Sequence, residues 1–224
     1  MMARYKLVLI GSTGGGVFSK IARHSFVREM SVEAVSDRDC GFLSVADSFG
    51  IQSVKIASSD GHSFSDALYQ RYRDNHDVIF LSFYTRLLKG VFLQKNKGRI
   101  FNCHPSILPS FKGMRGFEDT LDSSCTFMGS TLHMIDEGMD TGTSIIQAAI
   151  PLDRALPIAE NRHKIFLSQY YSTLQFLRWL DEGRLVLHAD GGFLLSGERF
   201  CPSIFSPNLD SDFFEFIGET DGLN

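Results

Sequence analysis

The chain has 224 residues, of which 43% are hydrophobic and 21% are charged, enough for one domain with a sizeable core. Its 22 Lys and Arg against 26 Asp and Glu give a net charge of −4, which argues against a protein that grips a nucleic-acid backbone. Near the N-terminus, the longest apolar run (residues 7–10) is shorter than the roughly 7–15 residues of a signal-peptide core or the roughly 20 of a membrane span. Four scattered cysteines without a C-x-x-C pair indicate reduced thiols: Cys40, Cys103, Cys125 and Cys201. We expect a cytoplasmic α/β protein with no membrane or nucleic-acid partner.

The first hundred residues alternate short apolar stretches with stretches of helical character. Strands are predicted at residues 6–10, 32–35, 51–56, 77–82 and 98–103. Helices are predicted between them, at residues 17–30, 39–49, 65–75 and 85–94. This alternation predicts a Rossmann-like, mostly parallel sheet with helices on both faces, connected by right-handed crossovers.

The pattern changes after residue 103. The prolines and glycines of residues 104–116 indicate an ordered loop, and mixed or antiparallel strands are expected to follow. The later elements are strands at 130–135 and 144–152, a long helix at 158–180, and a hairpin of 184–187 with 192–195 around a turn at 189–192. Without repeats or linkers, residues 1–204 are interpreted as one domain, with a nucleotide-binding-like half to about residue 100 and a second half from about 101. Residues 205–224 are interpreted as an acidic, Phe-rich tail that either stays free or packs on a neighbour.

A glycine-rich turn at residues 11–16 follows the first strand. It does not fit G-x-G-x-x-G, because Thr13 stands at the third position, and it does not fit a P-loop, because Val17 and not Lys follows Gly16. Backbone N–H groups at such a turn favour an anion. A tight turn that needs positive φ explains the glycines equally well.

Asn102 and His104 lie two residues apart at the end of a predicted strand, so their side chains share a face. Pro105 favours an extended His104. An amide and an imidazole at the carboxyl edge of a parallel sheet suit a carbonyl oxygen that gains negative charge, because both can donate a hydrogen bond to it. A capped loop with a hydrogen-bonded histidine is the structural alternative.

A second polar stretch presents Asp140 on a turn that contains Gly138 and Gly142. A carboxylate near His104 would favour the protonated ring, or would relay a proton through water. The alternative is an ordinary turn with solvated acids. Metal binding by His104, His133 and Asp140 has no supporting i,i+4 spacing, so no metal is predicted.

Three segments together resemble one known family: FNCHPSILPSFKG at 101–113, STLHMIDEGMDTG at 130–142, and IIQ at 145–147. They resemble the folate-dependent formyltransferases, and most of all the glycinamide ribonucleotide (GAR) transformylases of purine synthesis. The resemblance covers about residues 5–200. It implies a Rossmann-like fold and transfer of a formyl group from N10-formyltetrahydrofolate to a primary amine by direct attack, with no protein nucleophile and no metal.

The resemblance also assigns roles by position. Asn102, His104 and Asp140 match the catalytic amide, imidazole and carboxylate. The amide and the protonated imidazole would hold the oxyanion, and Asp140 would orient a water that moves the proton. His133 would support them. The folate is expected against Arg86, Leu87, Leu88, Leu93 and Ile100, with Ile135, Asp136, Glu137, Gly138 and Met139 over its other edge.

The acceptor is expected at Gly11, Ser12, Thr13, Gly14 and Gln169. Here the chain departs from the GAR transformylase pattern, because the asparagine of the glycine turn is missing. Gln169 replaces a glutamate, and Phe166 stands where a polar or basic residue would approach a phosphate. The acceptor is therefore either GAR or another amine, such as an amino sugar or a modified amino acid.

Other functions within the resemblance are less favoured. A methionyl-tRNA formyltransferase is expected to carry a longer, basic C-terminal domain. A formyltetrahydrofolate hydrolase normally carries an N-terminal regulatory domain, and a first strand at about residue 5 leaves no room for one. A non-catalytic folate-binding module would not need Asn102, His104 and Asp140 together, and an interaction protein would act through the Phe-rich tail. The sequence leaves open a monomer or a homodimer, and whether residues 113–118 close on a substrate.

Overall fold

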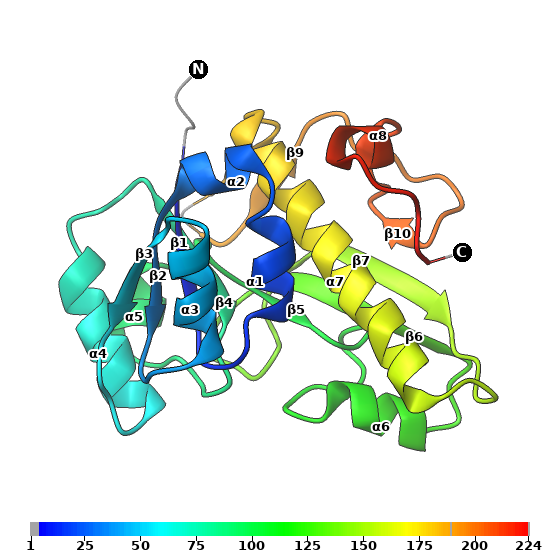
Figure 1. Ribbon diagram of the computed structural model, residues 1–224, viewed down its shortest axis with the longest axis horizontal. Coiled ribbons are helices and arrows are strands. Elements are labelled where there is room, and N and C mark those ends of the chain that lie inside the picture. Colours follow the sequence, from blue (N-terminus) through cyan, green and yellow to red (C-terminus); the bar gives the residue numbers. More distant parts are fainter. Residues whose placement is uncertain (1–4, 189, 224) are drawn as a thin grey trace.

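A single eight-stranded sheet with helices on both faces organises the protein, as seen in a computed structural model that describes residues 5–188 and 190–223 (Figure 1). The strand order is β10-β7-β6-β5-β4-β1-β2-β3, and β8 and β9 form a separate two-stranded sheet. The strands are β1 (Lys6–Gly11), β2 (Ser31–Ser36), β3 (Gln52–Lys55), β4 (Val78–Phe83), β5 (Ile100–His104), β6 (Phe127–Met134), β7 (Ser144–Pro151), β8 (Leu185–Leu187), β9 (Phe193–Leu195) and β10 (Phe205–Ser206). The helices are α1 (Gly16–Ile21), α2 (Ser25–Met30), α3 (Gly41–Ser48), α4 (Gly61–Tyr72), α5 (Val91–Lys95), α6 (Gly116–Asp122), α7 (Ile158–Asp181) and α8 (Phe213–Ile217).

Strands β1 to β5 pair in parallel, whereas β6, β7 and β10 are added antiparallel. This confirms the predicted fold class, including the change of pattern after residue 103. The parallel strands β1, β4 and β5 end at the same edge of the sheet. That edge is where open α/β sheets bind their ligands.

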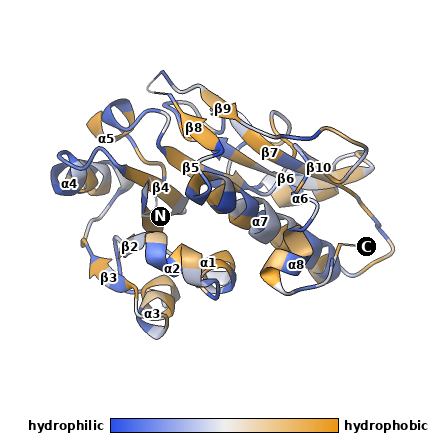
Figure 2. Ribbon diagram, turned by 90° about the horizontal axis from the view of Figure 1, so that it is seen from above, coloured by the Kyte–Doolittle hydropathy of each residue, from blue (hydrophilic) through white to orange (hydrophobic). Residues whose placement is uncertain are grey.

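Alternation along β1 builds a core on each face of the sheet. Leu7 and Leu9 join the core beneath α1, α3 and α7, and Val8 and Ile10 join the core beneath α4 and α5 (Figure 2). Both cores use phenylalanine heavily, and fully buried phenylalanine rings in the described chain include Phe18, Phe42, Phe64, Phe80, Phe92, Phe101, Phe176 and Phe213. The four cysteines are free.

The helix predicted over residues 17–30 is wrong in one respect, because the structure divides it into α1 and α2. The Arg28 guanidinium donates to the carbonyls of Ala22 and Arg23, both at 2.7 Å, and so satisfies the end of α1. The break lets His24 reach the Tyr170 hydroxyl on α7, at 2.9 Å. Helix α4 also differs from its prediction and begins four residues early, because the Asp60 side chain accepts from two backbone N–H groups of its first turn.

The helix predicted over residues 85–94 is largely absent, and only α5 forms. Gly90, with φ of 66°, separates α5 from the chain before it. Residues 84–89 form neither helix nor strand.

The C-terminal segment packs on the domain's own sheet and on α7. Strand β10 pairs with β7 and forms the edge of the sheet. On α8, Phe213 is fully buried, with its ring 5.9 Å from that of Tyr171. In the predicted turn of the β8–β9 hairpin, Ala189 lies outside the described residues. No helix in the described part of the chain is long and apolar enough to span a membrane.

Candidate active site

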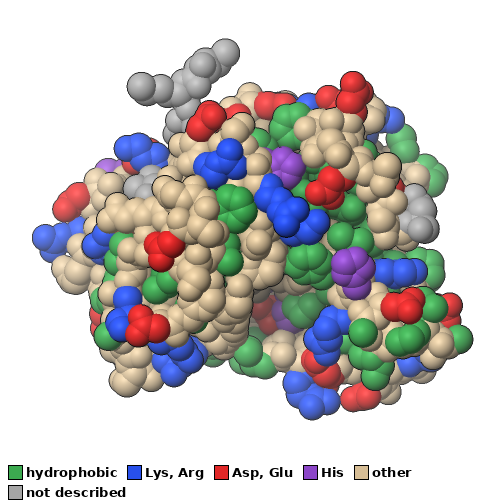
Figure 3. All heavy atoms as spheres, in the orientation of Figure 1, with side chains coloured by type: hydrophobic (Ala, Val, Ile, Leu, Met, Phe, Trp, Pro, Cys, Tyr) green, Lys and Arg blue, Asp and Glu red, His purple; other side chains and the backbone are tan. Residues whose placement is uncertain are grey.

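A cavity of about 640 Å³ lies at the carboxyl edge of β1, β4 and β5. Figure 3 shows this face hollowed below its centre, with acidic and histidine side chains on the floor. Its lining includes Thr13, Gly15, Gly16, Val17, Ser82–Phe83, Tyr84–Lys89, Asn102–Pro105, Gly113, Met114, His133, Ile135–Asp140, Phe166 and Gln169.

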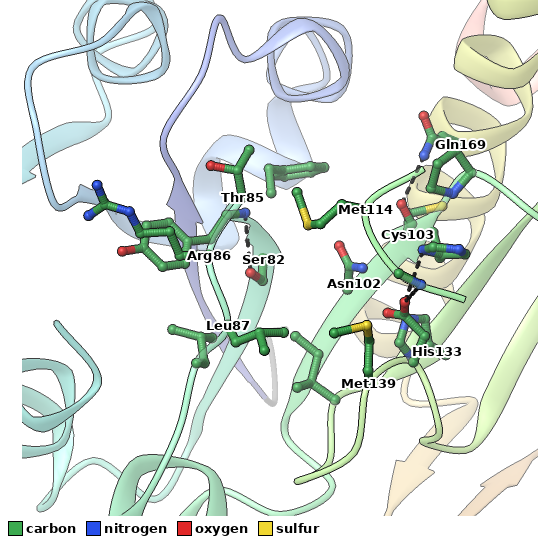
Figure 4. Close-up of a pocket in the computed structure, with 18 of the residues that line it drawn as sticks. Ser82, Thr85, Arg86, Leu87, Asn102, Cys103, Met114, His133, Met139 and Gln169 are labelled. Atoms are coloured by element: carbon green, nitrogen blue, oxygen red, sulfur yellow. Dashed lines mark hydrogen bonds and ion pairs between the residues drawn. The ribbon is translucent and has the colours of Figure 1, made fainter. Parts of the chain in front are cut away.

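Strand β5 supplies Asn102 and His104, as alternation predicts. Asn102 pairs in register with Ser82 on β4 and with His133 on β6, which fixes its position between two strands. Its half-buried amide points into the cavity (Figure 4) and has no hydrogen-bond partner within the described residues. A ligand in the cavity can therefore pair with this amide.

The Asp140 carboxylate meets His104 from the turn that follows β6. Its Oδ2 lies 3.4 Å from His104 Nδ1 and accepts a hydrogen bond from the backbone N–H of Gly113 at 2.8 Å. Asp140 has φ of 52°, a left-handed conformation that aspartate adopts more readily than most non-glycine residues. The turn and the loop before α6 therefore meet at this carboxylate.

His104 is held at both ring nitrogens. Nε2 donates to the Phe111 carbonyl at 2.8 Å, because a carbonyl oxygen can only accept. Nδ1 faces Asp140. A Cβ on Gly116 would lie 2.6 Å from Nε2, so glycine at this position lets the loop close over the ring.

His133 lies on the other side of Asp140. Its Nδ1 donates to the Met134 carbonyl at 2.8 Å, and its buried Nε2 stands 3.6 Å from Asp140 Oδ1 without a hydrogen-bond partner. Burial lowers the pKa of His133 and outweighs the attraction of Asp140, which acts to raise it. The ring is therefore neutral near pH 7, with the lone pair of Nε2 directed at the carboxylate.

The predicted folate residues divide into two groups. Arg86, Leu87, Leu88 and the turn from Ile135 to Met139 line the cavity. Leu93 and Ile100 do not, because both are buried in the core beneath α4 and α5. The structure thus assigns these two residues to the core and not to the lining of the cavity.

Among the predicted acceptor residues, Thr13 and Gln169 line the cavity, and Gly11, Ser12 and Gly14 do not. Gly11 packs against the Phe42 ring, and the Ser12 hydroxyl is occupied by Thr85 at 2.9 Å. Their places in the lining are taken by the next residues along the turn, Gly15, Gly16 and Val17.

The sequence analysis did not assign several lining residues. Met114 is 71% exposed and reaches the cavity from the loop before α6, which the sequence analysis predicted from its prolines and glycines. Thr85 and Lys89 fell inside the helix predicted over residues 85–94, and Tyr84 directly precedes it. No group of three or more His, Cys, Asp or Glu side chains in the described ranges is arranged to hold a metal.

A comparison with family models matches residues 41–164, over half of the chain, to the family described as formyl transferase. The chain belongs to the formyl transferase family. This formyl transferase is 36% identical over 123 residues to the phosphoribosylglycinamide formyltransferase of Bacillus subtilis, a match that covers 53% of the chain and 63% of the relative. It is 34% identical over 115 residues to the human trifunctional purine biosynthetic protein adenosine-3, covering 51% of the chain and 11% of the relative. The matches thus span less than two thirds of these relatives.

Solved structures of the same kind share the fold. Glycinamide ribonucleotide transformylase 1 from Symbiobacterium toebii superposes with a TM-score of 0.74 at 26% identity, over 85% of this chain and 93% of that one. Phosphoribosylglycinamide formyltransferase from Streptococcus pneumoniae superposes with a TM-score of 0.70 at 26% identity. That match covers 78% of this chain and 97% of the other. The resemblance read from the sequence is confirmed at the level of the family and the fold.

Proposed function

We propose that this formyl transferase moves a formyl group from N10-formyltetrahydrofolate to a primary amine of a small metabolite, by direct attack. The relatives that it resembles are named as formyltransferases of glycinamide ribonucleotide. The observation that carries the proposal is the meeting of an unpaired amide, an imidazole and a carboxylate at one cavity. Asn102 is free to donate, and His104 lies 3.4 Å from Asp140. This set needs no nucleophilic side chain.

In the proposed reaction the amine nitrogen attacks the formyl carbon, a new C–N bond forms, and the carbonyl electrons move onto oxygen. The Asn102 amide donates to that oxyanion, and so does the Nδ1–H of His104, because the Nε2–H of this ring is taken by the Phe111 carbonyl. A donor of this kind contributes about 10²–10³ in rate. When the oxyanion collapses, the bond from carbon to folate N10 breaks. One proton leaves the amine and one reaches N10, so the balance needs only a proton carrier.

Asp140 and His133 provide a place for that carrier. The carboxylate Oδ1 and the neutral Nε2 are both acceptors, 3.6 Å apart. A water that donates one hydrogen to either of these acceptors keeps its second hydrogen for the departing nitrogen and a lone pair for the proton of the amine. We assign to this water the transfer of the proton from the amine to the departing nitrogen.

The folate would lie between two walls of the cavity. One wall is residues 84–89, and the other is the turn from Ile135 to Met139. Exposed Leu87 and Met139, together with Ile135, offer apolar surface to a flat ring system. The cavity volume, about 640 Å³, falls within the range usual for small-molecule sites.

The acceptor end supports a second candidate substrate. The Phe166 ring covers Gly16, where a Cβ would meet it at 3.3 Å, and no lysine or arginine lines this end in the described part of the cavity. Gln169 donates its Nε2 to the Cys103 carbonyl at 2.8 Å, and Figure 4 shows its oxygen turned away from that contact, where it can accept from an amine. These groups favour an amine without a phosphate, such as an amino sugar or a modified amino acid, over GAR.

An acceptor screen tests the proposal and separates the candidates. The purified chain is incubated with N10-formyltetrahydrofolate and with GAR, amino sugars or ornithine-like amines, and the formation of tetrahydrofolate is followed. We expect turnover that depends on one class of amine. Equal turnover without any amine would identify a hydrolase, and no turnover with any of them would favour a non-catalytic folate-binding module.

A further inference from the structure

One wall of the cavity has no regular structure of its own. Residues 84–89, here called the 84–89 segment, follow β4, form neither helix nor strand, and all line the cavity. Because no sheet or helix orders them, their polar groups must be held by other parts of the fold. How the segment is held therefore decides the shape of this wall.

Three serine hydroxyls hold the backbone of the segment, and one of them, that of Ser82, accepts from the N–H of Tyr84 at 3.3 Å. The N–H of Thr85 donates to the Ser12 hydroxyl at 3.2 Å, and the N–H of Lys89 donates to the Ser65 hydroxyl at 2.9 Å. Each of these is a single hydrogen bond between neutral groups, which contributes modestly.

A buried carboxylate holds the side chains. Asp37 follows the end of β2, and its side chain is fully shielded from solvent. It accepts hydrogen bonds from the Tyr84 hydroxyl at 2.8 Å and from Arg86 Nη1 at 2.7 Å, and from Arg38 through two further bonds of 2.7 Å. Two of the six residues of the segment are thus tied to one anion, through the stronger, charge-assisted kind of hydrogen bond.

The contacts direct these side chains away from the reacting centre. Figure 4 shows the Arg86 guanidinium turned outward from the cavity, while the backbone that carries it stays at the cavity wall. Burial acts to raise the pKa of Asp37, yet the hydrogen bonds from Arg38 and Tyr84 outweigh it and hold this pKa below its usual value. Burial and Asp37 together raise the pKa of Tyr84 to about 12. Near pH 7 the carboxylate is therefore charged, and the hydroxyl keeps its proton.

We infer that Asp37 is a positioning residue that fixes the 84–89 segment as the folate-binding wall through its paired contacts with Tyr84 and Arg86. That the ligand is a folate rests on the proposed function. Asp37 itself does not line the described cavity. Without its charge, Arg86 loses its anion and the hydroxyl of Tyr84 loses a strong acceptor, so the segment samples other conformations and binds the folate less well.

The chain contains a matched control on the strand that leads into Asp37. Glu33 on β2 is 5% exposed and also binds an arginine and a tyrosine, through Arg71 at 3.0 and 2.6 Å and the Tyr72 hydroxyl at 2.6 Å. Neither Arg71 nor Tyr72 lines the described cavity. The variant E33Q therefore removes a comparable buried charge without touching the wall.

The test compares wild type, D37N and E33Q in two measurements. Steady-state kinetics give kcat and the KM for N10-formyltetrahydrofolate, and hydrogen exchange followed by mass spectrometry reports on peptides that cover residues 84–89. We expect D37N to raise that KM by about tenfold, with kcat at saturation changed less than about twofold, since a charge-assisted bond contributes about one such factor. Exchange in the segment should rise in D37N and stay at the wild-type level in E33Q, although both variants lose stability.

The inference is overturned if D37N leaves both the KM and the exchange at wild-type values, or if E33Q raises them as much. A wild-type chain that transfers no formyl group to any amine would overturn the proposed function instead, and the exchange measurement would still decide the role of Asp37. If D37N fails to fold, Tyr84→Phe removes one of the two contacts and keeps the carboxylate. Hydrogen exchange in the 84–89 segment should then rise by less than the loss of both contacts would cause. An exchange rate equal to that of wild type would count against the inference.

Discussion

Asp140 joins two parts of the chain that are distant in sequence. Its carboxylate contacts His104 on β5, His133 on β6 and the backbone of Gly113 in the loop before α6. A carboxylate with so many neighbours positions charge and proton carriers together. We expect the chemistry to depend on this residue more than substrate binding does.

Substitutions at Asn102 and Asp140 test the proposed roles of these residues in stabilising the oxyanion and in moving the proton. Asn102→Ala removes a donor to the oxyanion and Asp140→Asn removes the charge beside His104, so each should lower kcat by about two orders of magnitude or more. Turnover is measured at saturating folate and amine. Asp39→Asn, which removes a surface carboxylate 84% exposed and paired with Lys55, should leave kcat unchanged. Wild-type turnover in both site variants would refute the catalytic assignment.

His133 gives the fold a pH dependence of known sign. Burial lowers its pKa in the folded state, despite Asp140, whereas in the unfolded chain the pKa is about 6.5. Between these values only the unfolded chain is protonated, so this histidine's contribution to stability is complete above about pH 6.5 and is lost as the pH falls through the folded-state pKa. When the pH is lowered from 7 to 5, the free energy of unfolding, measured by urea denaturation, should fall less in His133→Asn than in wild type. Parallel curves for the two proteins would contradict this.

At the scale of elements, the loop before α6 depends on one glycine. A Cβ on Gly116 would lie 2.6 Å from His104 Nε2 and 3.0 Å from the Phe111 carbonyl, so Gly116→Ala must displace the ring or the loop. We expect kcat to fall by at least about tenfold, because misplaced catalytic groups lose rate steeply. Kinetics and thermal unfolding together test this, and full activity in a normally folded variant would be the contrary result.

Helix α8 tests whether residues 205–224 belong to the domain. Phe213 is fully buried against Tyr171, and Phe216 is 42% exposed beside the Arg178 guanidinium. Phe213→Ala should lower the free energy of unfolding by about 3–5 kcal/mol, and Phe216→Ala by about 1 kcal/mol or less. Denaturant unfolding measures both. Equal, small losses would indicate a segment that contributes little to the core.

The same elements show what the sequence could predict. The strands of the parallel sheet were found because buried strands read as continuous apolar runs between turn signals. The helix expected over residues 85–94 failed because tertiary contacts override local propensity. Ser12, Ser65 and Asp37 take up the polar groups of the 84–89 segment, and each comes from a different part of the fold.

The sequence likewise predicted one part of the candidate site and not the other. The pairing of Asn102 and His104 follows from strand alternation, a local rule. The neighbours of Asp140 depend on how the turn after β6 folds back, and only the resemblance to known formyltransferases anticipated them. Leu93 and Ile100 belong to the core and do not line the cavity, a distinction that position in a motif does not make.

At the scale of the whole molecule, the central claim is that one carbon passes from a folate to an amine at the carboxyl edge of the sheet. The arrangement of β1, β4 and β5 brings the glycine turn, the 84–89 segment and the Asn102–His104 pair to that edge. The added antiparallel strand β6 leads into the turn that carries Asp140. Every proposed contact depends on this one junction of parallel and antiparallel strands.

The most direct measurement follows the carbon itself. N10-formyltetrahydrofolate labelled with ¹³C in the formyl group is incubated with the chain and the amine that the screen selects, and ¹³C NMR locates the label. The account predicts an N-formyl amide on the acceptor with wild type, and a rate lower by about two orders of magnitude with Asp140→Asn. Label released as free formate at a rate independent of the amine, or label that remains on the folate, would contradict it.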